Sequence, residues 1–241
     1  MTSGLSPEDR KRVSAAIRAA EATTSGEIYC VLARRSDDYF FASSLMLTLG
    51  MLAASLVAAL VADWWWVDVS PVSMALAQAV AFASALLVLR VVPGLRVHLV
   101  PPRLRYRRAH DNAARQFLAH NVHATQARTG VLIFVSLAER YAEIVADSAI
   151  DEKVDQSTWN DIVARLVDSA RHDRLGEGFA NAVESVGALL AEHFPPGATN
   201  PNELDDHIAE YLPSFDVEGS RDITVEHLLT HTSGLPMSLL L

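Results

Sequence analysis

Two long uncharged segments constrain the fold of this chain more than any other feature. They cover residues 39–62 and residues 69–89, and neither contains Asp, Glu, Lys or Arg. An α-helix rises about 1.5 Å per residue, so about 20 apolar residues cross the roughly 30 Å hydrocarbon core of a bilayer. A buried hairpin of soluble helices is the alternative, but such helices normally carry a polar face. The sequence therefore predicts a transmembrane hairpin.

The residues that flank the two segments predict its orientation. The link at 63–68, "DWWWVD", contains no Lys or Arg, and its three Trp fit the aromatic belt of a membrane interface. Arginines instead precede the first segment and follow the second: Arg34, Arg35, Arg90, Arg96, Arg103, Arg105, Arg107 and Arg108. The positive-inside rule places both termini in the cytoplasm. The abundance of Arg and Ala indicates a bacterial chain, so we expect a two-pass protein of the inner (plasma) membrane.

The charge of the chain is unevenly distributed and indicates its partners. The formal net charge is −9; residues 1–109 hold 12 Lys and Arg against 8 Asp and Glu, whereas residues 110–241 hold 8 against 21. The basic part also contains the apolar segments, which favours a lipid bilayer and not nucleic acid as the partner. A protein of unknown identity is the second candidate partner. Cys30 is the single cysteine, which excludes an intramolecular disulfide.

A basic segment at 90–109 follows the second apolar segment. We expect its arginines to contact anionic lipid headgroups, each contributing about 1 kcal/mol near the surface, or to serve only as a topology signal. Pro101 and Pro102 predict a break in any long helix there. The candidate headgroup contacts are Arg103, Arg105, Arg107 and Arg108.

Hydrophobic periodicity predicts the remaining elements. Apolar residues at helical spacing predict helices at 6–24, 110–123, 155–171 and 178–193, with Gly176 and Gly178 breaking the last two apart. Runs rich in β-branched residues predict strands at 27–34, 131–137 and 142–146. Together they predict an α/β (α+β) sandwich, a small sheet covered by helices, that the hairpin interrupts. The expected parts are 1–38 and 110–196 for this domain, 39–89 for the hairpin, 90–109 for the basic segment and 197–241 for a tail.

Three stretches resemble a known family. "TSGEIYCVLAR" (24–34), "RTGVLIFVSLAERYAEIVADSAIDEKV" (128–154) and "WNDIV" (159–163) resemble the TPM domain, over roughly residues 8–195. That family includes plant thylakoid-lumen proteins, some described as acid phosphatases or calcium binders, and many bacterial membrane proteins. The resemblance implies a compact α/β domain. The hairpin after the first strand departs from the soluble members, so no catalytic residue is assigned.

Several acidic residues are candidates for a site. Asp147, Asp151 and Asp155 are four residues apart and would share one face of a continuous helix. Carboxylate oxygens are the ligands that Ca²⁺ prefers, although acidic residues near a helix N-terminus are also favoured by the helix dipole. Glu139 and Arg140, at the turn between two predicted strands, are candidate binding residues together with Glu27; a solvated turn is the alternative.

The tail carries a second resemblance. Residues 211–236, "YLPSFDVEGSRDITVEHLLTHTSGLP", resemble a segment of serine β-lactamase-like hydrolases. Those enzymes need a Ser-x-x-Lys nucleophile, and no Ser in this chain has Lys three residues later. We therefore expect no serine hydrolase activity. We expect the packed domain to end near "PPGATNPNE" (195–203) and the tail to form a helix or two loosely packed on it, or to be disordered.

The sequence thus predicts a membrane-anchored TPM-like domain that binds or scaffolds at the cytoplasmic face of the inner membrane. A metal-assisted phosphatase, with Ca²⁺ as the candidate ion, is the alternative.

Overall fold

The computed structural model describes residues 4–66, 68, 70–125, 127–196, 204 and 208–211. The chain divides into two compact units. The sheet unit comprises Met1–Ser36 and Ala109–Leu241, and the hairpin unit comprises Asp37–Arg108. Each unit is described by itself below.

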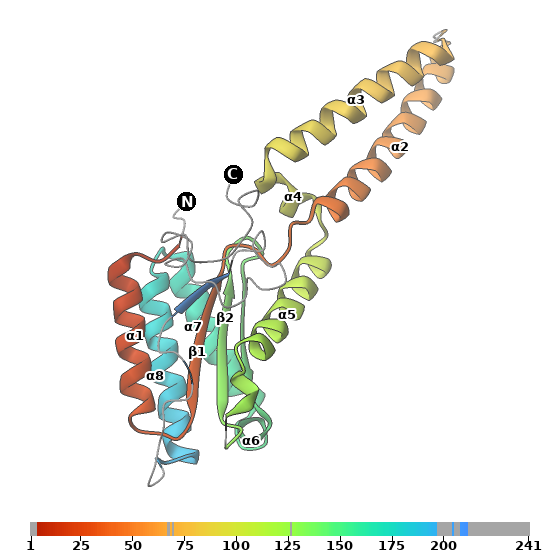
Figure 1. The fold of residues 1–241 in the computed structure, drawn as a ribbon. Helices are drawn as coiled ribbons and strands as arrows, with labels where there is room; N and C mark the ends of the chain where they lie inside the picture. The colour runs from red at the N-terminus through yellow and green to blue at the C-terminus, as the bar shows by residue number, and fades with distance from the viewer. Residues whose placement is uncertain are drawn as a thin grey trace. The chain divides into compact units, whose positions relative to one another are not determined.

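The described part of the sheet unit contains a four-stranded mixed sheet in the order β3-β2-β1-β4 (Figure 1). The central strand β1 pairs in parallel with both β2 and β4, and β2 pairs antiparallel with β3. The strands are β1 Glu27–Ala33, β2 Gly130–Ser136, β3 Tyr141–Ala146 and β4 Ile208–Tyr211. The predicted fold class, a small sheet covered by helices, is therefore confirmed.

The two parallel central strands are buried on both faces, which explains their continuous apolar sequences. Every residue of β1 and β2 is buried. Along β1, Ile28, Cys30 and Leu32 belong to one core cluster. The alternate residues Tyr29 and Val31 belong to a second cluster on the other face. A strand that is covered on both sides has no polar face, so its sequence lacks the alternation of an exposed strand.

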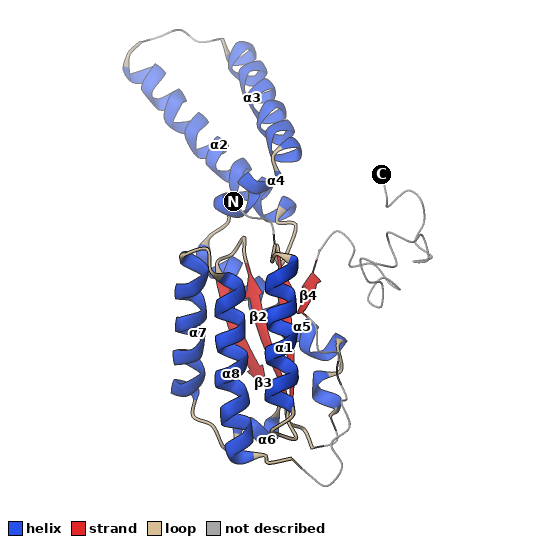
Figure 2. Cartoon of the chain, turned by 90° about the vertical axis from the view of Figure 1, so that its left-hand side faces the viewer, coloured by secondary structure: helices blue, strands red, loops and turns tan. Residues whose placement is uncertain are grey.

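Three helices cover one face of the sheet (Figure 2): α1 Pro7–Glu21, α7 Gln156–Arg171 and α8 Leu175–His193. The N-cap Ser6 begins α1, where its Oγ accepts a hydrogen bond of 3.1 Å from the backbone N of Asp9. Gly187 of α8 lies so close to α1 that an added Cβ would meet the Cβ of Ala20 at 2.5 Å. The helices α7 and α8 are separate, as predicted, but the break lies at residues 172–174 and not at Gly176, because α8 already begins at Leu175.

The second face is covered by the later residues of α5 Pro102–Ala119 and by the short helix η1 Val122–Ala124. Ala113 and Phe117 of α5 pack against this face. The predicted start of this helix near residue 110 is wrong. Proline fits the first turn of a helix, where its missing N–H is not needed, so Pro102 begins α5 and much of the basic segment is helical.

The sheet extends into the predicted tail. Ile208 pairs with Cys30 across the β1–β4 ladder, is 6% exposed and belongs to the core. The prediction that the packed domain ends near residues 195–203 is therefore wrong. The edge of β1 opposite β2 needs a hydrogen-bonding partner, and β4 supplies it. The predictions for residues 212–241 lie outside the described residues.

The hairpin unit contains α2 Phe40–Trp64, α3 Pro71–Val91 and α4 Pro93–Leu99. The helices α2 and α3 are long and apolar enough to span a membrane. At their base, the buried Arg96 donates a hydrogen bond of 2.9 Å to the carbonyl of Leu89, forms an ion pair with Asp38 and lies 5.2 Å from the centre of the Phe40 ring. Arg96 therefore connects the start of α2 with the end of α3.

The short helix α6, Ser148–Asp151, follows β3 in the sheet unit.

Candidate functional site

Three polar side chains form a buried cluster where β1 and β2 end. The carboxylate of Glu139 accepts a hydrogen bond of 2.9 Å from the backbone N of Ser36 and a second from Oγ of Ser136. Oγ of Ser36 donates to Oγ of Ser136 at 3.0 Å. Glu139 is only 2% exposed. The alternative of a solvated turn is therefore wrong for Glu139: its carboxylate connects the end of β1 to the β2–β3 turn.

The structure does not bring the three candidate binding residues together. Arg140 follows Glu139 but is exposed, with a left-handed φ of 53°. Glu27 lies at the opposite end of β1, opposite Gly130 in the register, and accepts a hydrogen bond of 3.3 Å from the backbone N of Leu204. Six steps of about 3.3 Å along the seven residues of β1 separate its two ends by roughly 20 Å. Glu27 therefore belongs to a different edge of the sheet from Glu139 and Arg140.

The three candidate calcium ligands occupy separate local structures. Asp147 is the N-cap of α6 and accepts a hydrogen bond of 2.6 Å from the backbone N of Ser148. Asp155 is the N-cap of α7. The condition for a shared face, one continuous helix, is not met, because α6 ends at Asp151 and α7 begins at Gln156. Within the described ranges, no group of three or more His, Cys, Asp or Glu residues could hold a metal ion.

The basic residues of α5 differ in their surroundings. Arg103 and Arg107 are exposed, and Arg105 is partly buried. Arg108 forms an ion pair with Asp37, with 3.4 Å between Nε and Oδ2. Arg103 and Arg107 are therefore the most accessible of the four candidate headgroup contacts, and such contact stays a prediction.

A surface cluster that the sequence did not predict joins α5 to β3. Nδ1 of His110 lies 2.9 Å and 3.0 Å from the two carboxylate oxygens of Glu143. The hydroxyl of Tyr141 donates a hydrogen bond of 2.9 Å to Glu143 Oε2. Burial, then the charge of Glu143 and this hydrogen bond, raise the pKa of Tyr141 above its ordinary value, so the phenol stays neutral and fixes the carboxylate. Glu143 in turn fixes the imidazole ring, and the ring's Nε2 has no partner among the described residues.

Such an arrangement suits binding. A carboxylate on one ring nitrogen fixes the tautomer and orientation of the imidazole and leaves the other nitrogen to contact a ligand. The side chain of His110 is 59% exposed, so a partner can reach it. The period of two in a strand places Tyr141 and Glu143 on one face, which the sequence does indicate. What the sequence does not indicate is that α5 lies against that face.

A second histidine, His120, has a structural role within the fold. Nδ1 of His120 lies 3.1 Å from the hydroxyl of Tyr29, and its Nε2 lies 3.1 Å from Oε1 of Gln116. The rings of Tyr29 and His120 are 4.5 Å apart. Both nitrogens of His120 are occupied, so this residue connects α5 to β1.

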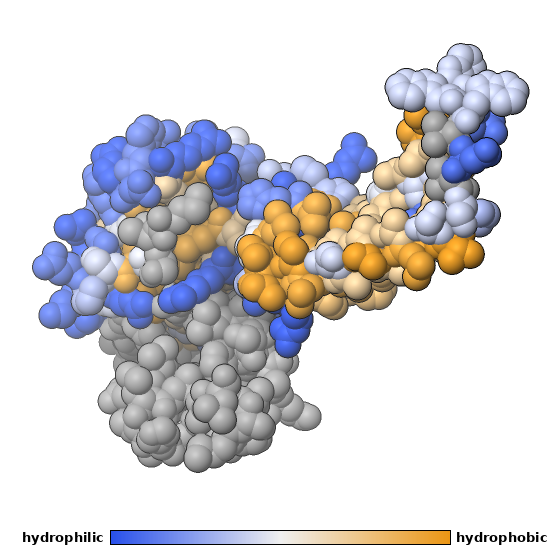
Figure 3. Space-filling view, turned by 90° about the horizontal axis from the view of Figure 1, so that it is seen from above, coloured by the Kyte–Doolittle hydropathy of each residue, from blue (hydrophilic) through white to orange (hydrophobic). Residues whose placement is uncertain are grey.

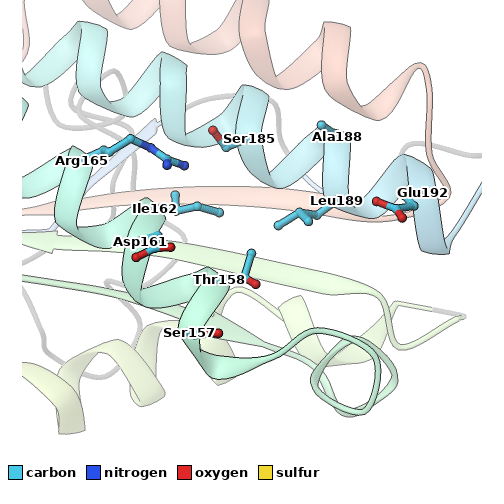
Figure 4. Close-up of a pocket in the computed structure, with 9 residues that line it drawn as sticks. All are labelled: Ser157, Thr158, Asp161, Ile162, Arg165, Ser185, Ala188, Leu189 and Glu192. Atoms are coloured by element: carbon cyan, nitrogen blue, oxygen red, sulfur yellow. The ribbon is translucent and has the colours of Figure 1, made fainter.

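An open groove of about 320 Å³ lies between α7 and α8. Figure 4 shows Arg165 extending from α7 across toward α8, with Asp161 on the same helix and Glu192 on α8. Charges of both signs and the hydroxyls of Ser157, Thr158 and Ser185 line the groove. These residues are suited to polar contacts with a partner and include no nucleophile with an adjacent base.

The comparisons with known proteins agree with this description. The family model of the TPM domain matches residues 93–189, and a beta-lactamase family model matches residues 200–239. None of the curated proteins compared with the chain matches it. The NMR structure of the BA42 protein from the psychrophilic bacterium Bizionia argentinensis is similar in fold, with a TM-score of 0.54 and 18% sequence identity over 88% of this chain and 98% of that one.

Both resemblances expected from the sequence are therefore confirmed. The beta-lactamase match falls mostly outside the described residues. The TPM match begins in the hairpin unit at Pro93 and ends inside α8, so it includes β2, β3 and α7. Residues 93–189 are thus similar to the TPM domain, and the fold of the sheet unit agrees with that similarity.

Proposed function

We propose that this chain is a two-pass membrane protein whose TPM-type domain is a binding module at the cytoplasmic face of the inner membrane. The observation that carries the proposal is the exposure of α2 and α3. Their most apolar 18-residue windows are 0% and 6% buried. Large apolar side chains such as Leu49, Leu56 and Val80 are more than half exposed along these helices, and Figure 3 shows the apolar surface that they form. A core helix of a soluble protein would be covered, so lipid is the environment that suits these helices.

The charges at the helix ends support the orientation. Asp63 lies in the last turn of α2 and Asp68 in the link to α3, and this end of the hairpin contains no Lys or Arg. Arg90 lies in the last turn of α3, and the arginines of α5 follow. A basic side is retained in the cytoplasm, which supports a cytoplasmic sheet unit. Exposed Arg103 and Arg107 then lie next to the membrane in sequence, as expected for contacts with anionic headgroups.

The contacts that the polar side chains make favour a binding role over a catalytic one. The buried carboxylate of Glu139 is used within the fold. The exposed cluster of His110, Glu143 and Tyr141 offers an oriented imidazole, but no described nucleophile lies within hydrogen-bonding distance of it. We propose this cluster as the contact site for a partner of the domain.

Labelling of engineered cysteines tests the membrane proposal. The native thiol of Cys30 is fully buried and is first removed by Cys30→Ala. Ser70→Cys then places a thiol in the turn between α2 and α3, and Glu8→Cys places one on the exposed side of α1. A membrane-impermeant maleimide added to spheroplasts should label the first variant, and the second only after permeabilisation. Release of the chain by sodium carbonate, or labelling of Glu8→Cys in intact spheroplasts, would contradict the proposal.

The binding site has its own test. Replacement of His110 by Gln should abolish the retention of proteins captured from detergent-solubilised membranes, whereas Arg174→Gln, at a distant exposed position, should not.

The phosphatase alternative has no structural observation in its favour within the described residues. Turnover of a phosphomonoester by the purified chain, dependent on an added divalent ion, would favour it.

A further inference from the structure

The short helix α4 has the reverse of the polarity expected in water. Its exposed side carries Leu95 and Leu99, which lie four residues apart. Its buried side carries Arg96, a charged residue that is only 5% exposed. In a water-soluble protein the arginine would face the solvent and the leucines would face the interior. A charged residue turned inward beneath exposed leucines is instead typical of a helix that has apolar surroundings.

The buried guanidinium of Arg96 finds all of its partners at the base of the hairpin. Its Nε donates a hydrogen bond of 2.9 Å to the carbonyl of Leu89, and one terminal nitrogen lies 3.4 Å from the carbonyl of Arg90. The other terminal nitrogen forms the ion pair with Asp38, and the group lies over the ring of Phe40. A buried charge is costly unless it is paired and hydrogen-bonded. Because these contacts satisfy it, Arg96 needs no water on the exposed side of α4.

The exposed apolar residues of α4 continue those of α3. Val88, Val92, Leu95 and Leu99 follow one another at spacings of four, three and four residues, and all of them are exposed. Only Pro93 and Gly94 separate Val92 from Leu95, so no polar side chain interrupts this run. The apolar surface that we assign to lipid on α3 therefore extends onto α4.

The lengths of the helices place α4 at the boundary of the hydrocarbon core. The 21 residues of α3 span about 31 Å, close to the roughly 30 Å thickness of the core. The 25 residues of α2 span about 37 Å and exceed it. Helix α4 begins directly after α3 and contacts both α2 and α3 (Figure 1). If α3 crosses the membrane, α4 thus lies at the level where the acyl chains meet the headgroups.

We infer that α4 is embedded in the interface of the cytoplasmic leaflet, with Leu95 and Leu99 in contact with acyl chains. The boundary between lipid and water then lies between Leu99 and the exposed Arg103, not at the end of α3. Helices with an apolar face bind in this position and bury that face about 5–10 Å into the boundary of headgroups and acyl chains. The inference rests on the proposed membrane insertion and extends the embedded part of the chain beyond α3.

Fluorescence quenching in vesicles of phosphatidylcholine and phosphatidylglycerol tests this position. In a Cys30→Ala background, single cysteines at Leu95, Leu99, Leu56 and Leu118 are labelled with an environment-sensitive fluorophore. Lipids that carry a nitroxide near the top of the acyl chain should quench the labels at Leu95 and Leu99 several-fold more than aqueous iodide does. Leu118→Cys is the matched control, an exposed leucine of the sheet unit, and should show the reverse.

The label at Leu56, an exposed position in α2, separates this inference from the proposed membrane insertion. A nitroxide deep in the acyl chain should quench it, and failure to do so contradicts the membrane anchor itself. If Leu56 is quenched but iodide reaches Leu95 and Leu99, α4 lies in water and the inference is overturned alone. If neither the nitroxide nor iodide quenches the labels on α4, protein covers these leucines and the inference is overturned as well.

Discussion

The backbone N–H of Ser36 donates a hydrogen bond of 2.9 Å to Oε1 of Glu139, although 103 residues separate the two in sequence. The second carboxylate oxygen of Glu139 accepts from Ser136. The bonds fasten the last residue of the sheet unit's first segment to the β2–β3 turn. Because the carboxylate is buried, its removal leaves donors without partners in a region that water does not reach.

Glu139→Ala should therefore destabilise the domain. Each buried donor left unsatisfied costs about 1–3 kcal/mol, so we expect a loss of about 2–4 kcal/mol in the free energy of unfolding. Urea unfolding followed by circular dichroism measures it. Arg140→Ala, at the exposed neighbouring position, should change the stability by less than about 0.5 kcal/mol. Equal effects of the two variants would contradict the role given to Glu139.

Strand β4 should contribute to stability even though it lies in the segment expected to be a loose tail. Ile208 is 6% exposed and belongs to the core. Truncating a buried Ile to Ala costs about 2–5 kcal/mol in a full core, and the lower value applies at an edge strand. Ile208→Ala should thus lower the free energy of unfolding by about 2 kcal/mol. Leu118→Ala, which truncates a leucine that is 57% exposed, is the matched control and should have little effect.

The contact between α1 and α8 should not tolerate a larger residue at Gly187. A Cβ there would meet the Cβ of Ala20 at 2.5 Å, well inside van der Waals contact. Overpacking of this kind typically costs about 1–3 kcal/mol, and it outweighs the helix propensity that alanine brings. Thermal unfolding of Gly187→Ala should show the loss. Glu184→Ala changes an exposed residue of the same helix and should leave the melting temperature nearly unchanged.

The thiol of Cys30 should report global unfolding. It is fully buried, and burial followed by the charge of Glu21 raises its pKa above the ordinary value. The folded chain at pH 8 should therefore react with iodoacetamide only when β1 is exposed, at a rate that increases with urea along the unfolding transition. Fast labelling of the native chain, before any change in circular dichroism, would contradict the buried position of Cys30.

The raised pKa of Tyr141 predicts a loss of stability at high pH. A group whose folded pKa is raised contributes stability that is complete below its unfolded pKa, about 10 for tyrosine, and is lost as the pH rises through the folded pKa. The free energy of unfolding should thus decrease above about pH 10. Tyr141→Phe in a Cys30→Ala background, where the buried thiol no longer titrates, should show a smaller decrease between pH 9 and pH 11. An identical pH dependence with and without the phenol would show that Tyr141 is not its source.

The elements that the sequence predicted are those whose signals are local. The continuous apolar runs of β1 and β2 and the helical stripes of α7 and α8 report burial directly. Strand β4 was missed because four residues give no periodic signal, and their role depends on an open edge of β1 that only the folded sheet defines. The burial of Glu139 also depends on Ser36, which is distant in sequence.

The candidate site was harder to predict for the same reason. Asp147 and Asp155 would share a face only in one continuous helix, but they occupy the N-cap positions of two separate helices, and the side chain of Asp147 caps the first of them. His110 and Glu143 meet only because α5 lies beside β3. A single sequence records the residue types of such a pair but not the packing that joins them.

The position of the hairpin in the chain has a consequence for the order of synthesis. Strand β1 leaves the ribosome before α2 and α3, and its neighbour β2 follows them; 100 residues separate Ser36 from Ser136, which are hydrogen-bonded in the finished domain. The pairing of β1 with β2 in the middle of the sheet therefore cannot form until both helices have been translated. During synthesis the two apolar helices are thus complete while the N-terminal strand β1 still lacks both of its neighbouring strands.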